Sequence, residues 1–534
     1  MKKHNTLKIV LITLAVFVVL SWILPTAAFY QGQVMEQGRN QIGLFDIFGS
    51  ANVALANFGY ISLFIIAVGM FYGVLNRTSA YKVLIDKLVK AFKGKEIIAI
   101  CSIMAFFAIV TSVCGLQFVL LFTFPFVIAL VLAMGYDKIV AALTTFGGAI
   151  VGMIGTTFAY NNVMLLADNL GLKFTNGIAY KIIIFLLCLG LLILNTIMYI
   201  SKKSKTSKEE KKEMEKLIPE EVSTKEKKTR VWPVVLIFDL ILVVSILGFI
   251  PWEKAFNITI FADITTAVTG FTIPAYIALI VLLLIINLVL VLKKKMRELI
   301  IVDSAVGVIA VVILIGKFVF KAKLFVNIFK GLTENFAIFG KILGTNVPAF
   351  GNWGTYENNF GLLLVATLIM VGAVVLALVY KVKKDDVLDG FIAGAKKALL
   401  PATFVILVYL GLILCNQYQF VIYKGIFSVT KGFNIFTSSL VQILSTVFNS
   451  DPLYAMNNTL PYLTSIVTNT KIYNVIWVLY QSVTGLTLFV APTSLLMLVT
   501  LHYLEIPYGK WLKTVWKLVL EMLAVILIIC LIML

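Results

Sequence analysis

Long apolar runs separated by short polar segments account for most of the chain. A helix needs about 20 apolar residues to cross the hydrocarbon core of a bilayer, and many of these runs reach that length. The pattern therefore predicts an all-α polytopic membrane protein with about 11 crossings. We expect the crossings at residues 7–29, 57–76, 138–172, 177–200, 232–250, 273–293, 299–318, 358–380, 398–416, 472–503 and 512–533.

Two further apolar segments, at residues 96–134 and 433–467, do not fit as simple crossings. Each has two apolar legs around a polar or glycine-bearing tip. Irregular backbone is tolerated at membrane depth where it lies within protein or lines a cavity, as in transporters. We interpret both segments as re-entrant hairpins that enter and leave the membrane on the same side.

A charged run at residues 201–230, SKKSKTSKEEKKEMEKLIPEEVSTKEKKTR, divides the chain. It has almost nothing apolar to bury, so we interpret it as a cytoplasmic linker. The domains are then a first repeat, the linker, intervening membrane segments and a second repeat. Their predicted bounds are 1–200, 201–231, 232–357 and 358–534.

The two repeats match in the order of their elements. Each contains two crossings, a short amphipathic segment (79–92 or 420–433), a hairpin, a long interrupted crossing and a final crossing. Within the hairpins, TFPFV at 123–127 aligns with TLPYL at 459–463. Because the two halves have opposite orientations in this topology, the order predicts an inverted repeat, which is typical of secondary transporters.

The basic residues indicate how the chain is oriented. The net charge of +19 comes from 41 Lys and four Arg that cluster beside apolar runs, so membrane orientation explains it better than nucleic-acid binding. With a cytoplasmic amino terminus, 33 of the 45 basic residues fall on the cytoplasmic side. We therefore predict a multi-pass protein of the cell inner (plasma) membrane. Its first hairpin opens to the cytoplasm and its second to the outside.

Motifs for catalysis and metal binding are missing from the sequence. The five Cys are scattered without CxxC spacing, only two His occur, and HExxH and GxSxG are absent. The chain also lacks the GxxxxGK[ST] phosphate loop that ATP-driven transport requires. We therefore expect no enzyme activity, no catalytic residue, no metal site and no cofactor beyond a coupling sodium ion or proton.

Several motifs resemble those of one transporter family. VLYQSVTGLTLFVAPTSLLMLVTLHYLEIPYGKWLK (478–513) resembles the carboxy-terminal signature of YfcC-type carriers, and DDVLDGFIAGAKKAL (385–399), WILPTAAF (22–29) and MGYDKIVAAL (134–143) resemble the same family. These carriers belong to the ion transporter superfamily, together with anaerobic four-carbon dicarboxylate carriers and p-aminobenzoyl-glutamate transporters. The resemblance implies a homodimer with a scaffold domain and a mobile, elevator-type transport domain.

The hairpin tips depart from the family pattern. The first tip retains Gly115 but lacks the family's paired acids, and the second reads NSDPLY at 449–454. The acidic Gly-Asp-Gly before the Pro-Thr-Ser break is replaced by SVTG at 482–485. The alternative to a transporter is therefore a non-transporting membrane scaffold or a channel-like subunit.

The interrupted crossings supply the candidate binding groups. A helix broken at membrane depth exposes N–H groups that attract anions and carbonyls that coordinate cations. Pro492 removes an N–H and opens the second interrupted crossing where its hydroxyls stand. The alternative is that these polar side chains join helices by hydrogen bonds. The predicted substrate-binding residues are Gly115, Gln117, Thr156, Thr157, Asn161, Asn162, Asn449, Ser450, Thr493 and Ser494.

Asp451 is the predicted coupling-ion residue, because an acid at a hairpin tip must face water, a cation or a partner. It could bind a proton, sodium or a substrate ammonium, and the alternative is a solvated Asp-Pro turn. No Arg lies in the predicted core, which favours a monocarboxylate, an amino acid or a peptide-like solute over a dianion. The predicted function is secondary active transport of a small organic anion, amino acid or peptide-like solute, cation-coupled or by exchange.

Overall fold

The computed structural model describes most of the chain, in two compact units that are described separately here. The first unit comprises Met1–Ile250 and Leu362–Leu534, and the second comprises Pro251–Gly361. The described residues are 5–30, 33–159, 170–173, 175–202, 214–215, 217–219, 229–249, 272–292, 296–318, 320–333, 335–337, 360–430, 433–467 and 469–534. Among them, seven helices are long and apolar enough to cross a membrane, and shorter apolar helices accompany these.

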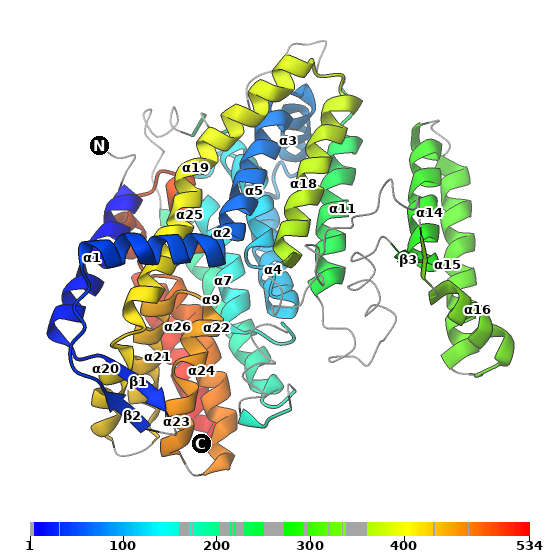
Figure 1. Ribbon diagram of the computed structural model, residues 1–534. Coiled ribbons are helices and arrows are strands. Elements are labelled where there is room, and N and C mark those ends of the chain that lie inside the picture. Colours follow the sequence, from blue (N-terminus) through cyan, green and yellow to red (C-terminus); the bar gives the residue numbers. More distant parts are fainter. Residues whose placement is uncertain are drawn as a thin grey trace. The chain divides into compact units, whose positions relative to one another are not determined.

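The first half of the first unit has the predicted order of elements (Figure 1). A helical hairpin lies between the amphipathic helix α3 and a crossing that is broken after α7. The bounds are α1 Asn5–Ile23, β1 Ala27–Tyr30, β2 Gln33–Glu36, α2 Leu44–Leu75, α3 Ser79–Ala91, α4 Glu96–Cys114, η2 Val119–Phe122, α5 Phe124–Ala133, α6 Lys138–Ala142, η3 Leu143–Gly147, α7 Gly148–Ile154 and α9 Ile178–Lys202.

The second half repeats that order. The hairpin is formed by α21 to α23, and the second broken crossing by α24 and α25. The bounds are α11 Trp232–Phe249, α18 Phe360–Val379, α19 Lys384–Cys415, α20 Gln419–Ser428, α21 Ile435–Asn449, α22 Pro452–Asn457, α23 Leu460–Ile466, η7 Thr470–Ile472, α24 Tyr473–Leu488, α25 Leu495–Tyr503 and α26 Tyr508–Met533.

The predicted crossing at 7–29 is too long at its carboxyl end. Helix α1 ends at Ile23, and residues 27–30 pair in an antiparallel ribbon with 33–36. Pro25 explains the early end, because a proline lacks an N–H and disfavours helical backbone in the residue before it.

Two crossings extend beyond the predicted apolar runs. Helices α2 and α19 are 32 residues long each, whereas the sequence suggested 57–76 and 398–416. They lie side by side and antiparallel (Figure 1): Ser62 donates to the Ala402 carbonyl at 2.9 Å, and Gly73 packs against Gly390. Glycine at this crossing lets the two backbones approach closely.

Two other pairs of matching helices are also antiparallel, which supports the inverted repeat. In α7 and α24, the backbone of Ile154 lies against Gly485. In α9 and α26, Asn195 donates to Glu521 at 2.8 Å, and Gly177 at the other end faces Met533. Three elements of one half thus pack against their counterparts in the other half, as expected for an inverted repeat.

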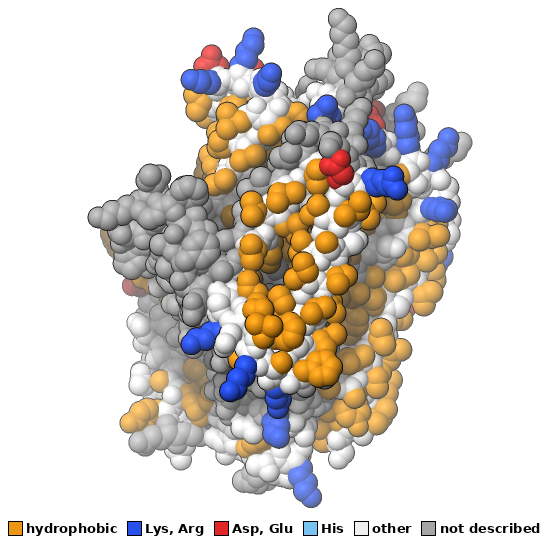
Figure 2. Space-filling view, turned by 90° about the vertical axis from the view of Figure 1, so that its right-hand side faces the viewer, with side chains coloured by type: hydrophobic (Ala, Val, Ile, Leu, Met, Phe, Trp, Pro, Cys, Tyr) orange, Lys and Arg blue, Asp and Glu red, His pale blue; other side chains and the backbone are white. Residues whose placement is uncertain are grey.

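The second unit contains a helical hairpin and a short ribbon. Its elements are β3 Thr272–Pro274, α14 Ala275–Leu292, α15 Met296–Phe318, α16 Lys323–Thr333 and β4 Asn335–Ala337. Helix α15 exposes much of its apolar surface, including Val308 at 64%. The face in Figure 2 carries apolar side chains in its centre and Lys and Arg toward its ends. Lipid is the natural neighbour of such a surface.

Candidate functional site

The first interrupted crossing breaks at Gly155, within the predicted crossing at 138–172. The broken backbone is held by the last turn of α4 in the first hairpin. The Ser112 hydroxyl donates to the Gly155 carbonyl at 2.7 Å, and the Thr157 N–H donates to the Ser112 carbonyl at 2.9 Å. Backbone groups that the helix no longer pairs are thereby satisfied by the hairpin.

The second interrupted crossing breaks between Leu488 and Leu495. Pro492 lies within this break, which is consistent with its missing N–H. The Thr493 hydroxyl donates to the Val447 carbonyl at 2.7 Å, which joins the break to α21 of the second hairpin. Each broken crossing is therefore fastened to its own hairpin.

The two fastenings are equivalent in the repeat. Ser112 and Val447 each precede by three residues a helix-ending residue with left-handed backbone, Gly115 (φ 71°) and Ser450 (φ 58°). Glycine adopts this conformation readily, whereas serine does so at a cost. The sequence alone did not reveal this equivalence, because a serine at the second tip gives no left-handed signal.

The predicted residues near the first break are buried. Thr156 and Thr157 are both buried, and the Thr156 hydroxyl donates back to Met153 at 2.9 Å within its own helix. Gly115 at the hairpin tip is close to this break, because a Cβ on it would lie 3.1 Å from Ala159, and Gln117 is buried two residues further along the chain. The other two predicted residues of this half, Asn161 and Asn162, lie outside the described residues.

The tip of the second hairpin is a hydrogen-bonded network. The Asn449 amide donates to Gln419 at 3.2 Å and to the Ser445 carbonyl at 2.8 Å, and its oxygen accepts from Asn458 at 2.9 Å. These bonds hold the tip against α20. The neighbouring Ser450 hydroxyl is buried and makes no hydrogen bond to the described residues. Ser494 is 1% exposed at the start of α25.

Asp451 is buried, with 5% of its surface exposed, so it does not form a solvated turn. Its carboxylate caps α22 by accepting from the Leu453 N–H at 2.9 Å, and it also accepts from the Tyr409 hydroxyl at 3.0 Å. The Tyr409 ring in turn stacks on Phe58, with centroids 3.7 Å apart. Helix α19 therefore contacts the acid at the second hairpin tip through Tyr409, and α2 packs against that tyrosine.

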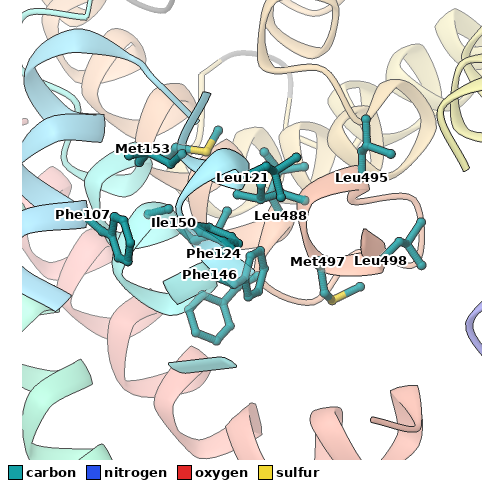
Figure 3. Close-up of a cluster of buried hydrophobic side chains, with 14 of the residues drawn as sticks. Phe107, Leu121, Phe124, Phe146, Ile150, Met153, Leu488, Leu495, Met497 and Leu498 are labelled. Atoms are coloured by element: carbon teal, nitrogen blue, oxygen red, sulfur yellow. The ribbon is translucent and has the colours of Figure 1, made fainter. Parts of the chain in front are cut away.

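Apolar side chains join the first hairpin to both broken crossings (Figure 3). The members of this buried cluster come from the hairpin, the segment η3 to α7, and the segment α24 to α25. They include Phe107, Leu121, Phe124, Phe146, Ile150, Met153, Leu488, Leu495, Met497 and Leu498. The polar groups of the two breaks thus adjoin a tightly packed apolar layer.

A chain of three side chains that the sequence analysis missed leads to the first break. The Gln481 amide donates to the Thr156 carbonyl at 2.6 Å and accepts from the Trp477 indole N–H at 3.1 Å. The Lys181 ammonium lies 4.0 Å from the centroid of the Trp477 ring. The only signal in the sequence is that Lys181 lies about one turn inside the predicted crossing at 177–200. It was interpreted as one of the basic residues at the outer end of that crossing.

The hydrogen bonds of Ser112 give a direct test of the fastening. Ser112→Ala leaves the Gly155 carbonyl without its side-chain donor, which should cost about 1–3 kcal/mol. We expect the thermal midpoint in detergent to fall by a few degrees at most, since the chain is long. The control is Ser465→Ala, because Ser465 is exposed and bonds only its own helix. Equal midpoints for the two variants would contradict the fastening.

Comparison with known proteins gives a family match over nearly the whole chain. Residues 4–534 match the profile of the family described as DcuC, C4-dicarboxylate anaerobic carrier. An uncharacterized protein of Haemophilus influenzae is 28% identical over 121 residues, which span 23% of this chain and 24% of that protein.

One solved structure is also similar at low identity. It is the crystal structure of the Alcanivorax borkumensis YdaH transporter, with 11% identity and a TM-score of 0.40 over 99% of this chain and 97% of that one.

Proposed function

The chain belongs to the C4-dicarboxylate anaerobic carrier family, and we propose that it is a secondary active transporter of a small organic anion across the cell inner membrane. The observation that carries this proposal is the pair of broken crossings, each fastened to its own hairpin in opposite orientation. Broken helices related by inverted repeats are the usual solute and ion sites of such carriers.

The proposed solute class is a four-carbon dicarboxylate, on the strength of the family match. Monocarboxylates, amino acids and peptide-like solutes remain the alternatives that the absence of core arginines favoured. Purified protein in liposomes should take up radiolabelled succinate, and unlabelled fumarate should compete more strongly than lactate, glutamate or a dipeptide. Uptake of one of the other solutes in preference to succinate would replace the proposed class, and absence of all uptake would favour a scaffold.

The proposed coupling ion is sodium or a proton, bound through Asp451. Asp451 is a buried carboxylate that accepts from the Tyr409 hydroxyl and the Leu453 N–H, and a carboxylate is the kind of side chain that binds sodium or a proton. Its place between the hairpin tip and helices α2 and α19 supports coupling of ion binding to hairpin movement. Exchange of two anions is the alternative mode.

We also propose an elevator mechanism in a homodimer. The mobile part would comprise both hairpins and both broken crossings, which hydrogen-bond to each other, and helices α2 and α19 would remain in the scaffold. The dimer proposal rests on the resemblance to YfcC-type carriers. A monomer in nanodiscs by mass photometry would contradict it.

The proposed topology makes opposite predictions for the two hairpin bases. Lys95 and Asn469 are both exposed, and four of the five native cysteines are buried. With Cys101→Ser as background, we expect Asn469→Cys to react with a membrane-impermeant maleimide in whole cells. Lys95→Cys should react only after permeabilisation, and the reverse pattern would invert the topology.

A further inference from the structure

Lys181 points into the protein from α9, although the residues directly before and after it are exposed. It is 1% exposed, whereas its neighbours Tyr180, Ile182 and Ile183 are 37–45% exposed. A lysine near a helix end normally extends its charged group to the membrane surface. The charged residue lies on the buried stripe of α9, together with Ile184, Phe185 and Cys188.

The Lys181 ammonium has no hydrogen-bond partner among the described residues. Among the described residues, its electrostatic contact is with the face of Trp477, whose ring centroid lies 4.0 Å from the Lys181 Nζ. The favourable free energy of a cation over an aromatic ring is smaller than the solvation free energy that an ammonium loses when it is buried. The group is therefore well placed to receive an anion.

The lysine is connected to the first helix break. Trp477 and Gln481, one turn apart on α24, join the ring under the ammonium to the Thr156 carbonyl. Both hydrogen bonds are buried, so they fix the ring and the amide in place. A movement of the backbone at the break would therefore also shift Gln481, Trp477 and the Lys181 ammonium.

We propose that Lys181 is the cation that binds a carboxylate of the transported anion, positioned by Trp477 and Gln481. The inference rests on the proposed function, since it names the residue that recognises the charge of the solute. It also supplies a cation in place of the missing core arginine, because an ammonium can bind a carboxylate as a point charge. Trp477 and Gln481 are positioning residues in this account.

The test compares binding of a dianion and a monoanion to wild type and Lys181→Met. The probes are succinate and monomethyl succinate, measured by calorimetry on detergent-purified full-length protein. We expect Lys181→Met to weaken succinate binding by about 10- to 100-fold, the loss of one charge-assisted hydrogen bond. We also expect it to reduce the preference for the dianion. A merely structural lysine would change both affinities in parallel, and that result would overturn the inference.

The thermal midpoint shows whether each variant is folded, independently of ligand binding. Replacing an unpartnered buried charge with an apolar side chain of similar size should raise the thermal midpoint of the ligand-free protein. Lys181→Gln is carried through the same comparison in case the methionine variant is not monodisperse. Lys317→Met is the matched control, because Lys317 also lies over an aromatic ring, at 3.0 Å from that of Phe329, but in the second unit. This control should keep wild-type affinities.

The outcomes separate this inference from the proposed function. Wild type that binds succinate, with unchanged affinities in Lys181→Met, contradicts the lysine site and leaves the carrier intact. Wild type that binds lactate but not succinate contradicts the four-carbon class, and the lysine site is then judged on lactate affinity, which should fall in Lys181→Met. Wild type that binds no carboxylate contradicts both.

Discussion

Replacing Gly73 with leucine should prevent recovery of folded protein. A Cβ at this position would meet the Gly390 carbonyl oxygen and lie 3.0 Å from the Cα of Gly394, and backbone atoms of α19 cannot move aside cheaply. Overpacking typically costs about 1–3 kcal/mol and occasionally more, and the rigid neighbours here favour the upper end. That loss is a large part of a typical stability of about 5–15 kcal/mol.

The measurement is the monodisperse yield and thermal midpoint in mild detergent. Gly73→Ala should already lower the midpoint, although alanine favours helix by about 1 kcal/mol over glycine. Gly49 is the control, because it is exposed on the same helix with nothing within 4 Å of a Cβ. We expect Gly49→Leu to fold normally. Equal yields of the leucine variants would contradict the close α2–α19 crossing.

Replacing Asp451 with asparagine should remove the ion dependence of uptake. Asparagine can still cap α22 through the Leu453 N–H, so the fold should survive with a loss of about 1 kcal/mol. The negative charge that would hold sodium or a proton is gone. We expect ion-stimulated uptake to fall by about tenfold or more, which corresponds to roughly 1.4 kcal/mol of lost coupling.

Asp137 offers a matched control for that substitution. It is also buried, caps α6 through the Val140 N–H at 2.9 Å and accepts from the Tyr199 hydroxyl at 2.8 Å. It lies at the start of the first broken crossing rather than at a hairpin tip. Asp137→Asn should therefore lower stability similarly and keep the ion dependence. If Asp451→Asn also keeps the ion dependence of uptake, then Asp451 caps α22 and does not bind the coupling ion.

The sequence predicted those elements whose local chemistry is distinctive. Hydrophobic runs located many of the membrane helices, Pro492 marked the second break, and the hydroxyl residues Thr156 and Thr157 pointed to the first. The polar start of α19 was missed, because Gly390 and Gly394 pack against α2 and extend the helix beyond its apolar run, and the exposed start of α2 was missed as well. The early end of α1 was missed for a different reason, because the effect of Pro25 can be read from the sequence and was overlooked.

The site was predictable only in part, for physical reasons. Hydroxyl and amide residues at membrane depth pointed to the breaks, but their partners come from other parts of the chain, as Thr493 and Val447 illustrate. Serine rarely adopts the left-handed backbone conformation that Ser450 has, so a rule based on residue type does not predict it. The inward direction of Lys181 depends on how α9 packs against α24, which one helix alone does not specify.

Accumulation of an anion against its gradient tests the central claim most directly. Proteoliposomes containing the full-length protein would be given inward sodium or proton gradients, and the internal concentration of radiolabelled succinate would be followed. A carrier predicts saturable uptake that rises above the external concentration and collapses when an ionophore dissipates the gradient. Non-saturable equilibration, or no uptake by monodisperse protein under either gradient, would contradict secondary active transport of this anion.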